Sequence, residues 1–343
     1  MIWAAEHLRR IVQIVAKLGS EVMSRQIILD VDTGTDDAVA ILLAALHPDL
    51  DLIGVTTVNG NVPVENTTDN TLRVLDLVGR SDIPVFPGLA HPIARRGFPG
   101  QRHFQQGTKA DMHGLSLPLP EARSSARSTS AVEYLVETLR STTEQLTLVA
   151  VGPLSNIATA VAIDPSLRDA VRELVIMGGA HACGNVTASA EFNVWADPEA
   201  AHMVLSAGFP HLTLVTLDAT HQALITRADC ERLAALGTPA GRAAADLITT
   251  RIDAYSANHA AKVDQTAPVH DAVCIAYLLR PETVTTRHLH VSVDTGGSAT
   301  VGRTIIDTRP NPTGAPNAHV AFTADPRKLV DLLVETFTPG SGR

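Results

Sequence analysis

The chain is poor in aromatic residues and in cysteine. Phe, Trp and Tyr make up 3% of its 343 residues, so few side chains are available to stack on a planar ligand. The three cysteines, Cys183, Cys230 and Cys274, are an odd number without CxxC spacing. This pattern argues against a disulfide framework or a zinc site and fits buried thiols in a reducing compartment. We therefore expect a cytoplasmic protein.

An excess of positive charge and a long hydrophobic run are absent too. The formal net charge is −9, which argues against nucleic acid as a partner, because phosphate binding needs a basic surface. No apolar run reaches the roughly 20 residues of a membrane span, so no membrane association is expected. What the chain does have is 45% hydrophobic and 18% charged residues, a composition typical of a globular fold with a sizeable core.

The amino-terminal segment differs from the rest of the chain. Residues 1–22 have apolar side chains at helical spacing, but Lys17 interrupts the apolar segment that a signal peptide needs. Met23 directly precedes the first strand-like run. We expect residues 1–22 to be an extension outside the fold and residues 23–343 to form a single domain, because no repeat or linker divides them.

Short apolar runs alternate with helical patterns along most of the chain. Strands are expected at 27–31, 52–58, 83–88, 146–152, 173–179 and 212–218, and helices at 36–46, 65–79, 131–140, 154–162 and 197–208. This alternation is typical of βαβ units. It predicts an α/β fold with an open, mostly parallel central sheet flanked by helices.

Other segments are less regular. Residues 89–129 are rich in Gly, Pro, Arg, Ser and His and predict a long surface loop, a kind of segment that often closes over a binding site. Residues 226–280 look wholly helical. Further strands are expected at 288–293, 299–306 and 318–323, followed by a closing helix at 325–337.

Four aspartates surround Gly34 where the first strand pattern meets the first helix pattern. Asp36 and Asp37 are explained by N-terminal helix capping alone, but Asp30 and Asp32 alternate on the strand and add charge that capping does not use. Carboxylates this dense are costly to hold without a cation. Ligands in α/β sheets bind at the carboxyl ends of strands. The cluster predicts a Ca²⁺ or Mg²⁺ site, since the ligands are oxygens.

Six sequence blocks point to one family. DVDTGTDDAVA (30–40) is followed by VNGN (58–61), VGPLSNIA (151–158), MGGA (177–180), GNVTASAEFNVWADPEAA (184–201) and APVHDA (267–272). In this order they resemble the nucleoside hydrolases, the inosine-uridine preferring N-ribohydrolases. The resemblance covers about residues 26–340 and implies the α/β fold of that family, with a single Ca²⁺ at the bottom of the pocket.

The resemblance also implies roles for the acidic residues. The Ca²⁺ ligands would be Asp32, Asp37, the main-chain carbonyl of Val151, and Asp271. Ca²⁺ would position the attacking water, and Asp32 would take the proton of that water as general base. A carboxylate-rich pocket suits the oxocarbenium-like charge that develops on the ribose.

The same resemblance implies the ribose contacts. Asn185, Glu191 and Asn193 would hold the 3′- and 5′-hydroxyls, and Asn61 and Asp36 would complete the set. Met177 would form an apolar floor under the sugar or base. Residue by residue, alternatives stay open: Asn185 is also a typical turn residue after Gly184, and a lone Met in a strand also fits core packing.

Two histidines are expected near the leaving base. His270 would protonate it, a role that an ordinary pKa of about 6.5 suits, and His113 resembles a second pocket histidine. LSLPLP follows the motif DMHG (111–114), where the family usually continues with a further glycine-containing stretch. The helix before PVHD offers only Tyr255, Asn258 and His259 where relatives place aromatic residues, so the choice between purine and pyrimidine stays open.

The function expected is calcium-dependent hydrolysis of ribonucleosides to ribose and a free base, in nucleoside catabolism or purine and pyrimidine salvage, by a homodimer or homotetramer. One alternative is a haloacid-dehalogenase-like phosphatase, which also begins with Asp-x-Asp after a strand, but Gly34 and the pair Asp36-Asp37 do not fit its pattern. The other is a calcium-binding relative without catalysis.

Overall fold

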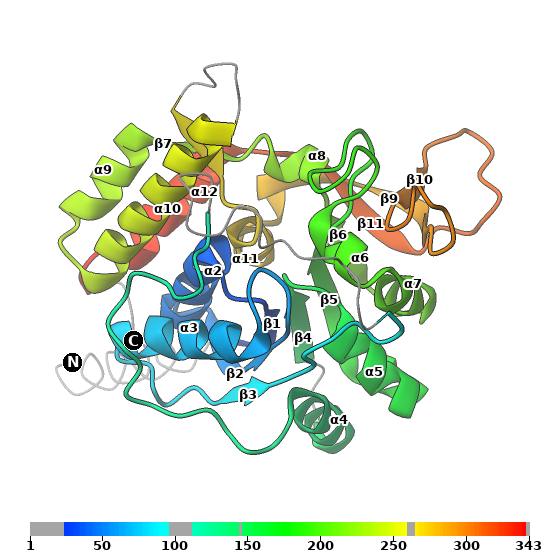
Figure 1. The fold of residues 1–343 in the computed structure, drawn as a ribbon, viewed down its shortest axis with the longest axis horizontal. Coiled ribbons are helices and arrows are strands. Elements are labelled where there is room, and N and C mark those ends of the chain that lie inside the picture. Colours follow the sequence, from blue (N-terminus) through cyan, green and yellow to red (C-terminus); the bar gives the residue numbers. More distant parts are fainter. Residues whose placement is uncertain (1–23, 96–111, 144–145, 259–264, 341–343) are drawn as a thin grey trace, which may run out of the picture.

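A single sheet of nine strands forms the centre of the molecule (Figure 1). The computed structural model describes residues 24–95, 112–143, 146–258 and 265–340. Within these residues no helix is long and apolar enough to cross a membrane. Residues 1–22, expected to lie outside the fold, are outside the described part of the chain, and so are residues 96–111 of the expected long loop.

The strand order in the sheet is β10-β9-β11-β6-β5-β4-β1-β2-β3. The strands are β1 Arg25–Val31, β2 Leu50–Thr57, β3 Val85–Pro87, β4 Leu146–Ala150, β5 Val171–Met177, β6 Leu212–Val215, β9 Val284–Val293, β10 Thr304–Asp307 and β11 Ala318–Ala324. Every pair from β3 to β11 in this order is parallel, whereas β9 runs antiparallel to both its neighbours. The predicted open, mostly parallel sheet is therefore confirmed.

Helices cover both faces of this sheet. They are α2 Thr35–Leu46, α3 Val64–Leu77, α4 Ala131–Ser141, α5 Ser155–Ile163, α6 Phe192–Ala196, α7 Pro198–Ser206, α8 Leu217–Thr220, α9 Arg227–Ala235, α10 Pro239–Asn258, α11 Ala272–Leu279 and α12 Pro326–Phe337, with 3₁₀ turns at Pro165–Ala170 and Pro281–Thr283. Figure 1 shows α4, α5 and α7 on one side of the sheet and α2, α11 and α12 on the other, with α9 and α10 packed against this second group.

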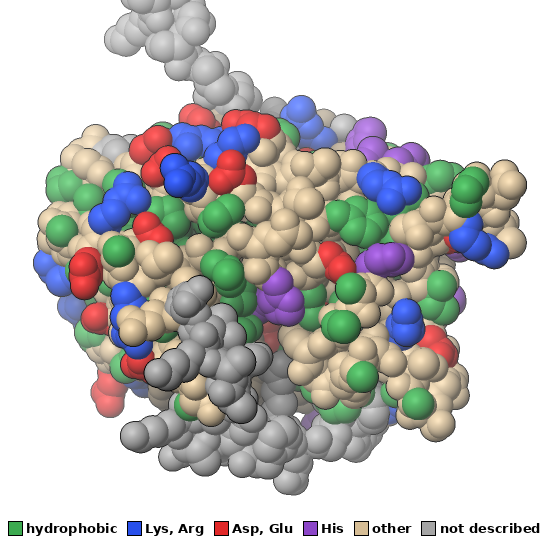
Figure 2. Space-filling model, turned by 90° about the horizontal axis from the view of Figure 1, so that it is seen from above, with side chains coloured by type: hydrophobic (Ala, Val, Ile, Leu, Met, Phe, Trp, Pro, Cys, Tyr) green, Lys and Arg blue, Asp and Glu red, His purple; other side chains and the backbone are tan. Residues whose placement is uncertain are grey.

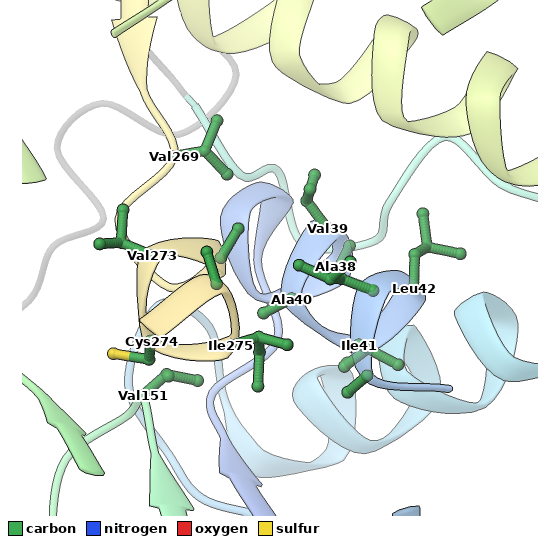
Figure 3. Close-up of a cluster of buried hydrophobic side chains, with 14 of the residues drawn as sticks. Ala38, Val39, Ala40, Ile41, Leu42, Val151, Val269, Val273, Cys274 and Ile275 are labelled. Carbon is green, nitrogen blue, oxygen red and sulfur yellow. The ribbon is translucent and has the colours of Figure 1, made fainter. Parts of the chain in front are cut away.

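Alternating strand residues build two hydrophobic cores, one for each face. Val31, Val149 and Val175 belong to the core shared with α2 and α11, whereas Ile28 and Leu148 belong to the core shared with α4, α5 and α7. This alternation follows from the two-residue period of a strand. In Figure 3, apolar side chains of α2 meet those of α11 beside the end of β4, so these three elements are held together by packing.

The prediction of continuous helix over 226–280 is wrong in two places. Gly237 ends α9 with a φ of 71°, and Pro239 opens α10 as a separate helix. Further on, β8 Thr266–Pro268 pairs antiparallel with β7 Leu224–Thr226. An extended segment is favoured before and at Pro268, because proline cannot donate a backbone hydrogen bond and restricts the residue before it.

Smaller differences concern the ends of elements. The expected strand at 83–88 shrinks to β3, bounded by Pro84 and Pro87, and the expected strand at 299–306 is only β10. Within residues 89–95 and 112–129 there is neither helix nor strand, as the loop prediction requires. The expectation of buried thiols holds for Cys230 and Cys274 but is wrong for Cys183, which is exposed.

Charge is mixed on the face of the molecule that Figure 2 shows. Lys and Arg side chains lie among Asp and Glu side chains, and several histidines lie nearby. The net charge of −9 is therefore not gathered on this face as one acidic patch.

Candidate active site

The topology of the sheet places a binding site between β1 and β4. From β1 the chain moves outward through β2 and β3, then returns to the other side of β1 as β4. At such a switch point the loops that leave adjacent strands diverge and open a crevice at the carboxyl edge. Asp32 follows β1 and Val151 follows β4, and the Val151 N–H donates to the Asp30 carbonyl over 2.8 Å.

A cavity opens at this edge. Its lining consists of Asp32, Asp36, Asn61, Met112, His113, Val151, Met177, Asn185, Glu191, Phe192, Asn193, Arg251, Tyr255, His270 and Asp271. All the sequence-predicted site residues except Asp37 are among them, although they come from segments up to 239 residues apart, between Asp32 and Asp271.

Asp37 is fully buried and held at the start of α2. Its two carboxylate oxygens accept the N–H groups of Asp32, over 3.2 Å, and Gly34, over 2.9 Å. Oxygen atoms of Asp36, Asp37 and Asp271 lie within 4.8 Å of one another, close enough to hold a metal ion. The geometric cluster thus contains Asp36, whereas the resemblance assigns Asp32 to the cation.

Asp32 is held from its other side by the segment after β2. Its Oδ2 accepts the Asn61 N–H over 2.6 Å, and the Asn61 amide also reaches Asp37 Oδ2 over 3.2 Å. A Cβ on Gly60 would lie 2.1 Å from Asp32 Oδ2. Only glycine permits this close approach at position 60, so the VNGN segment can position the Asp32 carboxylate through the Asn61 backbone N–H.

Burial and mutual repulsion act strongly on this cluster. Burial, with the neighbouring Asp36 charge, raises the pKa of Asp37 to about 7. Burial and the charges of Asp36, Asp37 and Asp32 raise the pKa of Asp271 well above its ordinary range. A divalent cation bound by oxygen atoms would reverse both effects. The donor set therefore fits a hard divalent cation, and Asp37 and Asp271 are the side chains that would hold it.

Arg251 is a pocket residue that the sequence interpretation missed. It lies in α10, is 1% exposed, and places its Nη1 2.8 Å from Asp36 Oδ1. This contact is an ion pair without hydrogen-bond alignment, because Asp36 Oδ1 has no hydrogen-bond partner among the described residues. Burial raises the pKa of Asp36, but the charges of Arg251, His113 and His270 outweigh burial and lower it. A signal was present in the sequence, since Arg251 falls three and four residues after the apolar Ile248 and Leu247.

The residues expected to bind ribose are held by the protein itself. Glu191 caps α6, accepting the N–H groups of Asn193 at 3.0 Å, Val194 at 3.3 Å and Gly179 at 2.9 Å. The Asn193 amide donates to the Val151 carbonyl over 2.7 Å. Asn185 Oδ1 accepts the Phe192 N–H over 3.0 Å. These contacts fix the side chains before any ligand arrives, which lowers the entropy cost of binding.

His270 lies in a buried network. Its Nδ1 is 2.7 Å from the Thr220 hydroxyl and its Nε2 is 3.2 Å from the Tyr255 hydroxyl. Burial and the Arg251 charge lower its pKa well below 6.5, so the expectation of an ordinary pKa is wrong. The ring is neutral near pH 7. Thr220 is a further residue that sequence interpretation missed, because a threonine in a short helix carries no signal of its partner.

His113 and Tyr255 complete the mouth of the pocket. His113 Nδ1 accepts the Thr35 N–H over 3.3 Å, and a Cβ on Gly34 would lie 2.0 Å from the same nitrogen. Of the three candidates for stacking on the base, Tyr255 lines the pocket, and His259 lies outside the described residues.

Comparison with known proteins agrees with this geometry. The family model of the inosine-uridine preferring nucleoside hydrolases matches residues 27–331. The chain belongs to this family. Nucleoside hydrolases act on N-glycosyl compounds, so the chain is a ribonucleoside-hydrolysing enzyme, and the phosphatase alternative has no support.

Individual nucleoside hydrolases are similar over nearly their whole length. The pyrimidine-specific ribonucleoside hydrolase RihB of Escherichia coli strain K12 is 40% identical over 287 residues, which cover 82% of this chain and 87% of the relative. A purine-preferring ribonucleoside hydrolase from Gardnerella vaginalis has a similar structure, with a TM-score of 0.81 and 31% identity over 91% of this chain and 98% of its own. A plant nucleoside hydrolase gives a TM-score of 0.82 with 30% identity, covering 92% and 99% of the two chains.

Proposed function

We propose that the enzyme hydrolyses the N-glycosidic bond of ribonucleosides in a calcium-dependent reaction, releasing ribose and a free base. The observation that carries this proposal is the meeting of buried carboxylates with amide side chains in one cavity at the switch point of the sheet. The oxygen donors of Asp32, Asp37, Asp271 and the Val151 carbonyl favour Ca²⁺ over a softer metal.

In this mechanism Asp32 is the general base. When bound, Ca²⁺ supplies positive charge that makes water more acidic and aligns the sugar. Asp32 takes a proton from the attacking water while the water oxygen bonds to C1′ and the electron pair of the broken C–N bond leaves with the base. The pocket carboxylates stabilise the positive charge that develops on the ribose.

Different residues bind the sugar and the base. Asn61, Asn185, Glu191 and Asn193, with Asp36, bind the ribose hydroxyls, because amide and carboxylate groups can serve hydroxyls that both donate and accept. His270 and the Tyr255 hydroxyl to which it is bonded relay a proton to the leaving base, and solvent water returns that proton to the pair, so the ring is neutral before and after turnover. Met177 and His113 contact the sugar or base.

Pyrimidine nucleosides are the first candidates for the preferred substrate. The 40% identical relative is named for pyrimidine specificity, whereas a structural neighbour at 31% identity is named for purine preference. Cytoplasmic location and a homodimeric or homotetrameric state stay predictions.

A substrate panel tests the proposal. Initial rates of base release are measured with uridine, cytidine, inosine, adenosine and 2′-deoxyuridine, before and after removal of divalent ions by chelation and again after Ca²⁺ is restored. We expect uridine or cytidine turnover that falls on chelation and returns with Ca²⁺. An Asp32→Ala variant should lose activity by at least about a thousandfold. Base release that survives this substitution would refute the mechanism, and an inactive wild-type enzyme would support the non-catalytic alternative.

A further inference from the structure

Arg251 has unusual surroundings for a cation in a substrate pocket. Its guanidinium donates through Nε to the Pro268 carbonyl over 3.0 Å and through Nη1 to the Thr35 hydroxyl over 3.1 Å, and Nη1 lies 2.8 Å from Asp36 Oδ1. Thr35 opens α2 beside Asp36 and Asp37, and Pro268 ends β8 just before Asp271. One side chain thus joins the two segments that supply the buried carboxylates.

Asp36 could serve either as a ligand of the cation or as a binding group for the sugar. By distance alone, Asp36, Asp37 and Asp271 form a ready cation site. Whether Asp36 is drawn to the cation or is left for a sugar hydroxyl depends on what neutralises its charge. Arg251 is the guanidinium paired with it, and guanidinium stays charged at any working pH.

We propose that Arg251 is a positioning residue that reserves Asp36 for the substrate and keeps it off the cation, leaving the cation to Asp37, Asp271 and Asp32. This proposal rests on the calcium-dependent function proposed above. Asp36 lines the cavity and its Oδ1, although paired in charge, has no aligned hydrogen bond among the described residues. The carboxylate has about four lone-pair sites, so Asp36 can still accept a ribose hydroxyl on its cavity side while Arg251 holds Oδ1.

The shape of the guanidinium explains why arginine occupies this position. Its contacts with Pro268, Thr35 and Asp36 use two nitrogens of one rigid plane. An ammonium group is a point charge on a flexible stem and cannot span these acceptors in the same way. Lysine would keep the positive charge but would hold Asp36 less firmly.

Calcium affinity and substrate kinetics test the proposal together. Ca²⁺ binding is measured by titration calorimetry with calcium chloride on chelator-treated protein, and kcat and KM are measured with the best substrate of the panel. In Arg251→Met, Ca²⁺ should bind at least about fivefold more tightly, because a nearby positive charge is lost and Asp36 is released to the ion. KM should rise at least about tenfold while kcat changes less.

Four further variants separate positioning from folding. Asp36→Asn alone should weaken Ca²⁺ binding several-fold, because the Arg251 charge is then uncompensated, and adding Arg251→Met should restore the wild-type affinity to within about twofold. Arg251→Lys should keep the wild-type Ca²⁺ affinity with an intermediate KM. Arg242→Met, an exposed position on the same helix, makes the same change in net charge and should alter neither quantity.

The outcomes distinguish this inference from the function on which it rests. If the wild-type enzyme binds Ca²⁺ and hydrolyses nucleosides but folded Arg251→Met binds Ca²⁺ no more tightly, the inference is wrong and the function stands. If Asp36→Asn abolishes Ca²⁺ binding and Arg251→Met does not restore it, Asp36 is itself a ligand and the inference is again wrong. Should Arg251→Met fail to fold, Asp36→Asn and the double variant still decide the matter.

Discussion

At the scale of single residues, burial decides the chemistry of each aspartate more than its type does. Asp30, Asp32, Asp36 and Asp37 are all buried within the same short segment, yet each has a different partner. Asp30 accepts from the Thr56 hydroxyl over 2.5 Å and from the Asn156 amide over 2.8 Å, and it does not line the cavity. It therefore supports the end of β1.

Asp30 leads to a prediction about pH. Burial, only partly offset by the bonds from Asn156 and Thr56, raises its pKa from 3.8 to about 6. The folded protein holds this proton more tightly than the unfolded chain, so the contribution to stability is fully present below about pH 4 and is lost as pH rises through about 6. Asp30→Asn, which stays neutral, should stabilise the fold at pH 7 by up to about 3 kcal/mol, with no gain near pH 4.

Urea unfolding of both proteins between pH 4 and pH 7.5 measures this difference. Asp164→Asn is a control of opposite sign, because the bonds from Ser166 and Arg140 lower the pKa of Asp164 to about 2. A gain from Asp30→Asn that is independent of pH would contradict the assignment.

At the scale of elements, carboxylates at helix starts accept backbone N–H groups in and around the site. The carboxylates of Asp37, at the start of α2, and Glu191, before α6, both accept hydrogen bonds from backbone N–H groups near their own helix. Asp197 does the same for α7 and ties in two other segments. Its carboxylate accepts from Ala200 N at 3.1 Å, from the Ser155 hydroxyl at 2.6 Å and from Ile93 N at 2.8 Å.

Removing this cap should cost stability rather than catalysis. Asp197 is fully buried and is not a cavity residue, so Asp197→Ala leaves two buried donors and one half-buried donor without acceptors and should lower the free energy of unfolding by about 3 kcal/mol. Asp325→Ala is the matched control, because Asp325 caps α12 through one bond, to Arg327 N, and should cost about 1 kcal/mol. Urea unfolding measures both, and base release below the unfolding transition should persist. An equal cost for the two variants would show that the added contacts of Asp197 contribute nothing.

At the scale of the whole molecule, the site joins parts of the chain that have no local reason to meet. Asp37 comes from the start of α2, Val151 from the end of β4, and Asp271 from the start of α11. The core shared by these elements brings them together (Figure 3). A cation bound between them would therefore bind the folded protein and not the unfolded chain.

Ca²⁺ should consequently stabilise the whole fold. At a concentration about one hundredfold above its dissociation constant, a ligand of the folded state adds about 2.7 kcal/mol, which should raise the melting temperature of chelator-treated protein by several degrees. Asp271→Asn should lose most of this rise, whereas Asp164→Asn, at the cap of the Pro165–Ala170 turn and outside the cavity lining, should keep it. An equal rise in Asp271→Asn would argue against Asp271 as a ligand.

The family, the parallel sheet and most of the residues that line the pocket can be predicted from the sequence. The hydrophobic periods that predict strands and helices are local features of the sequence. The blocks that carry the resemblance are also local, because their glycines, carboxylates and amides stand close together in a fixed order. The sequence predicts neither the break between α9 and α10 nor the short β8, because the apolar stretches around Gly237 and Pro268 favour a continuous helix.

The pairing of charged groups in the pocket depends on the three-dimensional fold and cannot be predicted from the sequence. No local pattern pairs Arg251 with Asp36, which lies 215 positions earlier, or encloses His270 between Thr220 and Tyr255. Burial sets the pKa values of these groups, and burial depends on how α2, α10 and α11 pack on the sheet. The physical reason is that electrostatic interactions in a pocket follow distance in space and exclusion of water, neither of which a short stretch of sequence contains.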